Sequence, residues 1–310
     1  MVKIAVVGSI VMDLAIQIKR LPKPGETLLC ESYKLGPGGK GANAAVAAAR
    51  GGADSVLIGC IGDDAFGQME LNSLGQEGVH LDSIVVRPRT CTGLGIAMID
   101  PSGDNTIAVV PGANDYLNPE DIRKGLKSHI DTTNVILVNF EVPEPVVAEV
   151  IRLGNSNNIP VIVDAGPARA YHPDTWAGAY ILSPNDMETA TLVGRPITND
   201  NEARKAAREL LDRGPRAVVL HRGDRGALIV TEDKEISIPA FQVSVVDTTG
   251  AGDAFAGMLA VSVASGLPLE VAVRRANAAG ALAVTRIGTL PIMPTCQEVD
   301  AFLDNIDKLN

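Results

Sequence analysis

The chain has 310 residues, of which 46% are hydrophobic and 21% are charged, and its formal net charge is −10. This length fits one large domain or two modest ones. The composition is ordinary for a folded globular protein and excludes a chain that is disordered, collagen-like or coiled-coil throughout. An acidic chain whose basic runs never exceed two residues repels nucleic acid and anionic membranes, so we expect neither as a partner.

The cysteines lie far apart, with no CxxC or other metal-ligand spacing; they are Cys30, Cys60, Cys91 and Cys296. This pattern favours free thiols over a disulfide framework or a zinc site, and free thiols are typical of a reducing cytoplasm. The apolar stretch at residues 4–12 is short and lacks a small-residue cleavage site, so it does not predict a signal peptide. No apolar run has the length of a membrane span. We therefore expect a cytoplasmic protein.

Predicted strands and helices alternate along the chain. Apolar runs rich in β-branched residues are typical of strands covered on both faces, and they occur at 3–8, 55–59, 134–138, 161–164, 179–182 and 217–221. Helical patterns occur at 41–50, 143–155, 186–193, 201–213, 251–265 and 269–285. This alternation predicts an α/β fold, with a mostly parallel sheet and helices on both of its faces.

Two segments interrupt the alternation, and each is predicted to be an antiparallel hairpin. In the first, residues 15–18 and 27–33 flank the loop Leu-Pro-Lys-Pro-Gly at 21–25. In the second, residues 95–99 and 106–110 flank Asp-Pro-Ser-Gly-Asp-Asn at 100–105, a strong turn signal. A small sheet projecting from the α/β body could serve as a lid. We expect a single domain over 1–310, with the lid built from about 13–35 and 94–111.

The most informative motif, Asp-Thr-Thr-Gly-Ala-Gly-Asp at 247–253, joins a β-rich run to an apolar helix. Gly250, Ala251 and Gly252 allow backbone N–H groups to crowd at the helix N-terminus, which binds anions. Asp253 falls in the first turn, where the helix dipole favours its ionised form. A carboxylate beside an anion hole suits phosphoryl transfer to an alcohol, because it can take the hydroxyl proton. The same residues also fit a plain helix cap.

A second glycine-rich loop, Gly-Pro-Gly-Gly-Lys-Gly-Ala-Asn at 36–43, precedes an alanine-rich helix. It is not a Walker A loop, because Gly41 follows Lys40 where that motif has Ser or Thr. It matches GxGxxG, but the dinucleotide fingerprint belongs directly after the first strand, which here ends far upstream at Gly8. A third interpretation is a loop around a hydroxylated ligand, with Lys40 and Asn43 as donors. This loop alone leaves the question open.

Taken together, these loops resemble those of the ribokinase family of sugar kinases, also called the phosphofructokinase-B family. The resemblance runs nearly end to end, and the set of motifs in this order is highly specific. The motifs are Gly8-Ser9 with Asp13, Gly38-Gly-Lys-Gly-Ala-Asn43, Gly62-Asp-Asp64, Gly112-Ala-Asn114, Glu141 after a strand, Pro184-Asn-Asp-Met-Glu188 as the NxxE element, and Asp247-Thr-Thr-Gly-Ala-Gly-Asp253.

The resemblance implies a ribokinase-like fold with a small β-sheet lid, and a homodimer paired through that lid. It implies transfer of the γ-phosphoryl group of ATP to the 5-hydroxyl of ribose, with Mg2+ and with K+ as a monovalent activator. The implied catalytic residues are the base Asp253 and the anion hole of Gly250, Ala251 and Gly252. Contacts to the sugar are implied for Asp13, Gly39, Lys40, Asn43, Glu141 and Asp253.

The remaining roles that the resemblance implies concern ATP and its metal ions. Contacts to ATP are implied for Asn185, His221, Gly223, Gly226, Gly252 and Asn277. Glu188 is implied to organise Mg2+ through water. The monovalent cation is implied to lie against Asp247 and Thr249, with carbonyls near Val284, Ile287 and Thr289. Two of these assignments have plain structural alternatives: Asn185 with Glu188 also fits a capping box, and His221 a solvated histidine.

Four positions depart from the pattern of ribokinases. Val11 replaces an Asn that contacts the sugar, so this position leaves open which sugar is the acceptor. His221 and Asn277 replace a Thr and a His, which suggests altered contacts to the nucleotide. Ile292 stands where a hydroxyl residue near the cation is common, which weakens the case for K+.

We therefore expect an ATP-dependent carbohydrate kinase acting on D-ribose. The alternatives within the family are 2-deoxyribose, another pentose, a ketohexose or a nucleoside. Two other classes remain: an oxidoreductase with a nucleotide cofactor, which rests on the GxGxxG match alone, and a sugar-binding protein without catalysis. The intact Asp253 beside its glycines argues against the last of these.

Overall fold

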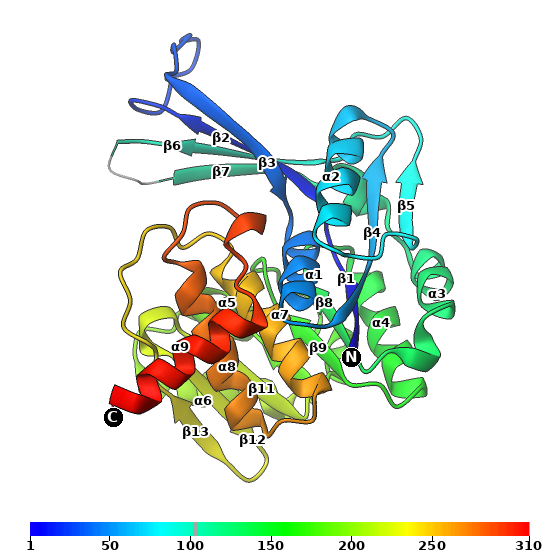
Figure 1. The fold of residues 1–310 in the computed structure, drawn as a ribbon, viewed down its shortest axis with the longest axis vertical. Helices are drawn as coiled ribbons and strands as arrows, with labels where there is room; N and C mark the ends of the chain where they lie inside the picture. The colour runs from blue at the N-terminus through cyan, green and yellow to red at the C-terminus, as the bar shows by residue number, and fades with distance from the viewer. Residues whose placement is uncertain (102–104, 310) are drawn as a thin grey trace.

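The computed structural model describes residues 1–101 and 105–309 (Figure 1). Its main element in these residues is a nine-stranded sheet with the order β13-β12-β11-β10-β9-β8-β1-β4-β5. The strands are β1 (Lys3–Val7), β4 (Asp54–Gly62), β5 (Ile84–Arg87), β8 (Val135–Asn139), β9 (Val161–Asp164), β10 (Ile181–Ser183), β11 (Ala217–His221), β12 (Ala227–Thr231) and β13 (Glu235–Ile238). Neighbouring strands run parallel except at the β11–β12 and β12–β13 pairs, so the sheet is mostly parallel, as predicted.

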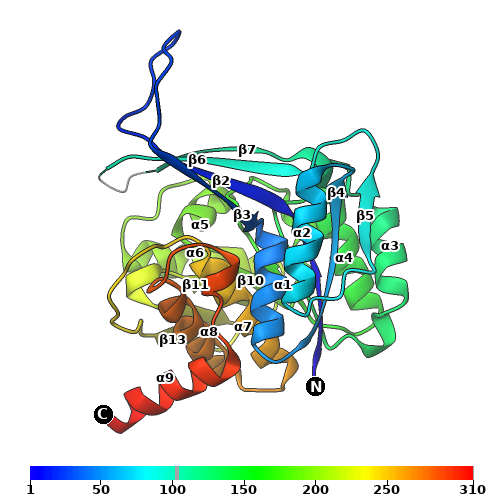
Figure 2. The same ribbon diagram turned by 45° about the horizontal axis from the view of Figure 1, so that its top comes forward.

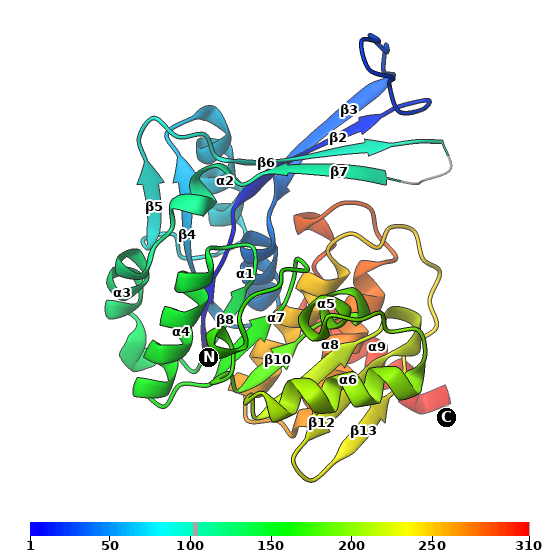
Figure 3. The same ribbon diagram turned by 180° about the vertical axis from the view of Figure 1, so that it is seen from behind.

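Helices cover both faces of this sheet. One face packs against α1 (Lys40–Arg50), α7 (Ala251–Ala264), α8 (Leu269–Ala283) and α9 (Cys296–Leu309). The other face, seen in Figure 3, packs against α3 (Pro119–Lys127), α4 (Glu144–Ser156), α5 (Asp186–Val193) and α6 (Asp200–Asp212). Along each central strand, successive side chains point to opposite faces of the sheet. They are therefore buried alternately in the hydrophobic core on one face and in the core on the other. The predicted three-layer α/β architecture is confirmed. No helix among the described residues is long and apolar enough to cross a membrane.

A second, four-stranded sheet projects from the end of the large sheet where its parallel strands finish (Figures 1 and 2). Its order is β3-β2-β6-β7, with β2 (Val11–Gln17), β3 (Ser32–Gly38), β6 (Gly93–Ile99) and β7 (Asn105–Val110). The two predicted hairpins form it, joined by the parallel pair β2–β6. A further helix, α2 (Ala65–Gln76), packs against β2 and β3.

The bounds of one hairpin differ from the prediction, because β3 begins at Ser32 and continues through Gly36-Pro37-Gly38, whereas a strand was predicted at 27–33. Glycine and proline weaken a strand signal, so the sequence pattern misplaced this strand. In the other hairpin, residues 102–104 of the predicted turn at 100–105 lie outside the described residues.

The order of the strands creates a switch point at β1, which is flanked by β4 on one side and β8 on the other. In open α/β sheets, ligands bind beyond the carboxyl ends of the strands at such a point. The chain comes very close to itself there: a Cβ on Gly41 would lie 2.4 Å from the Gly8 carbonyl carbon. Only glycines allow the start of α1 to approach the end of β1 this closely.

Candidate active site

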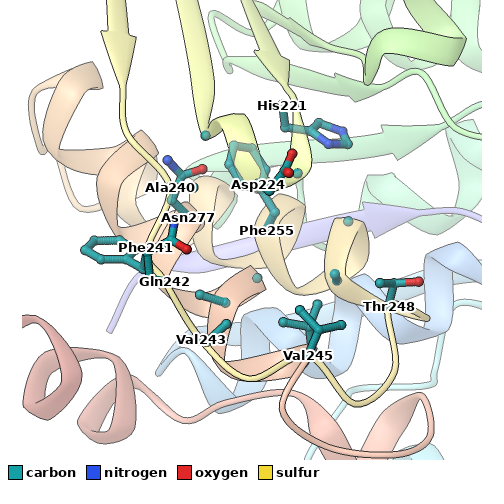
Figure 4. Close-up of a pocket in the computed structure, with 17 residues that line it drawn as sticks. His221, Asp224, Ala240, Phe241, Gln242, Val243, Val245, Thr248, Phe255 and Asn277 are labelled. Atoms are coloured by element: carbon teal, nitrogen blue, oxygen red, sulfur yellow. The ribbon is translucent and has the colours of Figure 1, made fainter.

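Two cavities meet beyond the carboxyl ends of the strands. One, of about 460 Å³, is bounded by the segment from Ala240 to Thr248 and by α7 and α8 (Figure 4). The other, of about 440 Å³, reaches Lys40, Asp164 and Asp253. Both cavities are lined by His221, Gly223, Thr248 and Gly252. They therefore form two parts of one continuous site.

Asp253 lies in the first turn of α7 and is 5% exposed. Its Oδ1 accepts a hydrogen bond from Lys40 Nζ at 3.2 Å, and its Oδ2 accepts one from Asn43 Nδ2 at 2.8 Å. Gly250, at φ 76°, provides the left-handed residue that precedes the helix. Among the described residues, the N–H groups of Gly250 and Gly252 make no hydrogen bond, and that of Ala251 makes only a long one, 3.4 Å, to the Thr248 carbonyl.

Lys40, the first residue of α1, is the cation at the centre of the site. Its ammonium group lies 3.6 Å from Asp164 Oδ2, in addition to its bond with Asp253. Burial alone would lower the pKa of Lys40, but the surrounding carboxylates, Asp164 foremost, raise it well above the ordinary value. Lys40 is therefore protonated throughout the physiological range. Its backbone N–H donates to Glu141 Oε2 at 3.1 Å, and the Ser9 hydroxyl donates to the same oxygen.

Asp13 lies on β2 at the base of the small sheet, between two glycines of the neighbouring strands. A Cβ atom on Gly38 would lie 2.0 Å from Asp13 Oδ2, and a Cβ atom on Gly95 would lie 2.5 Å from Asp13 Oδ1. Because both residues are glycines, the Asp13 carboxylate has room between the strands. Burial, reinforced by the charges of Glu141 and Asp253, raises the pKa of Asp13 to about 7. Gly39, at φ 90°, carries the chain from β3 into α1.

Asn185 and Glu188 form the predicted capping box of α5, with the Asn185 side chain accepting from Glu188 N and the Glu188 side chain accepting from Asn185 N, both at 2.8 Å. Ligand atoms of Glu188, Asp164 and His221 lie within 4.8 Å of one another and could hold a metal ion. Burial raises the pKa of Glu188, and Asp164 raises it further while Lys40 opposes the shift. Burial lowers the pKa of His221 to about 4, so its ring is neutral and can act as a ligand.

The larger cavity collects the remaining residues that were predicted to contact the nucleotide. His221, Gly223, Gly226 and Asn277 all line it, and the Asn277 Nδ2 donates to the Pro239 carbonyl at 3.3 Å. Figure 4 shows the segment that carries Phe241, Gln242, Val243 and Val245 running along its rim. The cavity is thus largely apolar, with a few polar groups, as small-molecule sites usually are.

Two loops bring the residues of the predicted cation site together. Asp247 Oδ1 accepts from Thr249 N at 2.9 Å, and its Oδ2 accepts from Gly288 N, between Ile287 and Thr289, at 3.3 Å. The Val284 carbonyl accepts from the N–H groups of Val246 and Asp247, which occupies both of its lone pairs. The Thr289 hydroxyl donates to the Pro37 carbonyl at 2.7 Å and so ties this loop to the base of the small sheet.

Two of the departures from the family pattern have a clear structural setting. Val11 is 3% exposed and lies two residues before Asp13, so both side chains are on the same face of β2. A Cβ atom placed on Gly95 of the neighbouring strand would contact the side chains of both Val11 and Asp13, so these two side chains lie close together. Ile292 is 1% exposed and packs against Gly250 instead of offering a hydroxyl group.

Functional candidates of two kinds were not predicted from the sequence. Asp164 ends β9, and Ser9, which was named only as part of a motif, follows β1. Ligands of open α/β sheets bind beyond the carboxyl ends of the strands, and this rule would have selected Asp164. The residues at 240–245 that line the larger cavity carry no motif. Their position depends on where the chain returns after β13, which no local pattern indicates.

Comparison with known proteins agrees with this geometry. The model of the pfkB family carbohydrate kinases matches residues 1–296. A ribokinase of Bacillus subtilis is 40% identical over 97% of this chain and 99% of its own, and a deoxyribokinase of Salmonella typhi is 34% identical over 97% and 98%. The structure of Arabidopsis thaliana ribokinase complexed with ribose and ATP superimposes with a TM-score of 0.91 at 31% identity, covering 98% and 99% of the two chains. The chain therefore belongs to the pfkB family of carbohydrate kinases.

Proposed function

We propose that this protein transfers the γ-phosphoryl group of ATP to the 5-hydroxyl of D-ribose, giving ribose 5-phosphate and ADP. The observation that carries the proposal is the setting of Asp253, whose carboxylate is held by Lys40 and Asn43 directly beside free N–H groups of the α7 N-terminus. The relatives named ribokinase, and the ribose and ATP in the Arabidopsis complex, support this choice of substrates.

In this proposal Asp253 is the general base for the acceptor. It takes the proton of the 5-hydroxyl as the oxygen attacks the γ-phosphorus. The other hydroxyls of the sugar contact Asp13, Gly39, Lys40, Asn43 and Glu141. Carboxylates accept hydrogen bonds from hydroxyls, and Lys40 and Asn43 donate to them. These contacts hold the 5-hydroxyl oxygen in line with the γ-phosphorus, which lowers the entropic part of the activation barrier to phosphoryl transfer.

The backbone at the start of α7 stabilises the transferred group. Gly250, Ala251 and Gly252 line the two cavities, and we assign their N–H groups to the phosphoryl oxygens that gain charge, because preorganised donors of this kind need no rearrangement during the reaction. The Lys40 ammonium, which remains protonated, adds a positive charge on the same side. Asn185, His221, Gly223, Gly226 and Asn277 then hold the rest of ATP along the two cavities.

Mg2+ is part of the proposal, and the residues present fit it. Glu188, acting through water, and the neighbouring Asp164 supply the oxygen ligands that Mg2+ prefers. When bound, the ion neutralises charge on the phosphate oxygens. His221 is a less usual neighbour for Mg2+, since imidazole suits softer metals.

K+ is the second ion of the proposal, held near Asp247, Thr249, Ile287 and Thr289. The Asp247 carboxylate supplies a charge, and carbonyl oxygens of the 284–289 loop supply dipoles. Because the Val284 carbonyl already accepts two hydrogen bonds, we assign it the smallest part in binding the ion. A cation here would stabilise the turn that presents the Gly250–Gly252 N–H groups.

We further propose that the four-stranded sheet is a lid over the acceptor and that it pairs two copies of the chain as a homodimer. On the face of the sheet that carries Asp13, β7 exposes two large apolar side chains, Ile107 at 57% and Val109 at 48%. An apolar sheet surface of this kind favours association. Light scattering coupled to size exclusion is expected to give twice the chain mass, and Ile107→Lys with Val109→Lys is expected to give one chain mass. A wild-type monomer would exclude this mode of pairing.

A second candidate acceptor is 2-deoxyribose, and Val11 favours it. Valine presents an apolar surface beside Asp13 where an Asn could bond a hydroxyl. The relatives include a deoxyribokinase.

A coupled assay of ADP release decides between these acceptors. The panel contains ATP with D-ribose, 2-deoxyribose, another pentose, a ketohexose and a nucleoside. We expect the highest kcat/KM for ribose, and a higher value for deoxyribose would replace it as the acceptor. Absence of acceptor-dependent ADP release, together with sugar binding by calorimetry, would leave a binding protein instead. NAD binding would point to the oxidoreductase alternative.

A further inference from the structure

Glu70 is a fully buried acid that the proposed mechanism does not use. It lies in the middle of the buried face of α2, between Gly67 and Leu74, and it is 0% exposed. This face packs against β2, β3 and β4, so helical periodicity calls for an apolar residue here. Within the described residues, neither carboxyl oxygen has a hydrogen-bond partner. An unpaired buried carboxylate is strongly unfavourable, so a functional reason for Glu70 is to be sought.

The neighbours of Glu70 belong to the acceptor side of the site. Burial raises the pKa of Glu70 to about 9; the nearby Gly38 amide, which does not reach hydrogen-bond geometry, lowers the pKa, and the charge of Asp13 raises it. Gly38 is also the residue against which the Asp13 carboxylate packs from β2. Gly38 is followed by Gly39, the N-cap of α1, and by Lys40, its first residue. Glu70 and Asp13 thus flank the segment that leads to the proposed sugar contacts.

Among the described residues of the surrounding elements, no cation compensates Glu70. Asp13 is the charged group that acts on it from β2, and Lys34 on β3 is exposed. On β4, Asp54 lies at the start of the strand and pairs with Lys3. Asp64 caps α2 and bonds Thr92. The ammonium of Lys40 is bound by Asp253 and Asp164.

We propose that Glu70 is held as a neutral carboxylic acid beneath the small sheet and is a positioning residue for the acceptor, fixing Gly38 and Asp13. Neutrality matters because Asp13 already faces Glu141 and Asp253. An ionised Glu70 behind it would repel the Asp13 carboxylate and push it and Gly38 away from the positions that contact the sugar. Ionisation of Glu70 at alkaline pH would therefore weaken acceptor binding. This inference rests on the proposed kinase function.

The test compares Glu70→Gln, which keeps the shape and neutrality, and Glu70→Leu, which removes the polar group. Glu77→Gln, at the end of the same helix, is the matched control, because Glu77 pairs with Arg50 away from the site. The first readout is KM for ribose from about pH 7 to about pH 10. Wild type and the control are expected to show a several-fold rise in KM above about pH 9, with kcat unchanged. Lys40 stays protonated there and does not cause the rise.

Glu70→Gln is expected to match wild type at neutral pH and to lose the alkaline rise, whereas Glu70→Leu is expected to raise KM at every pH. An alkaline rise that persists in Glu70→Gln would overturn the proposal, as would a wild-type KM in folded Glu70→Leu.

A second readout, the free energy of unfolding of the ligand-free protein, does not depend on activity. Since the folded pKa of Glu70 is raised, its stabilising contribution is complete below about pH 4.5 and is lost as pH rises toward about 9. Glu70→Gln is expected to remove this part of the decline and Glu77→Gln to keep it. An unchanged decline in Glu70→Gln would show that Glu70 is ionised in the folded protein and would refute the inference. If no acceptor is turned over, the proposed kinase function fails, and this readout still tests the neutral acid.

Discussion

Single residues in the site place many negative charges around one cation. Asp253 and Asp164 both lie against Lys40, and Glu141 accepts a hydrogen bond from its backbone N–H. Such crowding is costly for the apo protein, and it suits a reaction that requires one carboxylate to accept a proton beside phosphate. The chemistry therefore depends on which carboxylate faces the attacking hydroxyl.

Asp253→Asn is expected to abolish phosphoryl transfer while ATP and sugar still bind. The amide is nearly isosteric but cannot accept the hydroxyl proton, and loss of a general base costs about 10²–10⁴-fold in rate. Steady-state kinetics measure kcat, and calorimetry measures binding. Asp304→Asn, an exposed position on α9, is the control and should keep wild-type activity. Retention of more than about a third of kcat, with chemistry rate-limiting, would exclude Asp253 as the base.

Val11→Asn is expected to shift selectivity toward ribose over 2-deoxyribose. A hydroxyl that is buried against valine without a partner costs about 1–3 kcal/mol, and 1.4 kcal/mol corresponds to about tenfold in affinity. The measurement is the ratio of kcat/KM for the two sugars, in both variants, at saturating ATP. If the ratio does not change in a folded, active variant, then Val11 does not face the acceptor.

At the scale of elements, the contact between α1 and α7 positions the proposed catalytic groups. Helix α1 carries Lys40 and Asn43, and α7 carries Asp253. The two helices approach closely at Gly257, where a Cβ would lie 2.5 Å from the Ala47 Cβ. Helix packing thus sets the distances of 2.8 and 3.2 Å within the site.

Gly257→Ala is expected to lower both stability and kcat. The added methyl group overpacks the helix contact, which costs about 1–3 kcal/mol, and it moves α7 relative to Lys40. The matched control is Gly75→Ala in α2, where the nearest atom lies 3.8 Å away. That change is expected to stabilise by about 0.5–1 kcal/mol, as alanine does within a helix. Urea unfolding and kcat measure both effects, and equal stability of the two variants would contradict the packing argument.

The loops at 246–249 and 284–289 make a prediction about ions. K+ is expected to raise kcat or to lower KM for ATP relative to Na+, because a cation beside Asp247 would hold the turn before Gly250 in place. The comparison is made at matched ionic strength with saturating Mg2+. Identical kinetics in the two salts would remove the monovalent ion from the mechanism.

For the whole molecule, the buried carboxyls predict an unusual dependence of stability on pH. The folded pKa values of Asp13, Asp164 and Glu188 are all raised, chiefly by burial. A raised pKa means that the folded state binds more protons than the unfolded one, so the contribution to stability is lost as pH rises from about 4 to about 7. The ligand-free protein is therefore expected to unfold at a lower temperature at pH 7.5 than at pH 5.5.

Asp13→Asn is expected to remove part of this difference, as measured by thermal unfolding followed by circular dichroism. A midpoint that rises steadily with pH would show that the paired surface carboxylates outweigh the buried ones.

The local sequence determined the inner strands of the large sheet, from β11 to β4 in its order. The six predicted strands and six predicted helices that alternate along the chain are all present. A strand that is buried on both faces is apolar along its whole length, and a helix repeats its apolar residues with the helical period, so both patterns can be recognised in the sequence. Strands β5, β12 and β13, at the two sides of the large sheet, and helices α2, α3 and α9 were not predicted. Strand β3 was misplaced, because glycine and proline weaken the pattern of a strand.

The sequence also determined the proposed reacting groups that sit in short motifs, since the turn at Gly250 and the first turn of α7 are local structures that place Asp253 beside free N–H groups. Only the tertiary structure decided which distant groups surround them. Asp164 reaches Lys40 because β9 lies two strands from β1, the larger cavity takes its wall from the segment after β13, and Glu70 meets Gly38 and Asp13 because α2 packs beneath the small sheet. Strand order and helix packing bring these residues together, and neither is encoded by a local pattern.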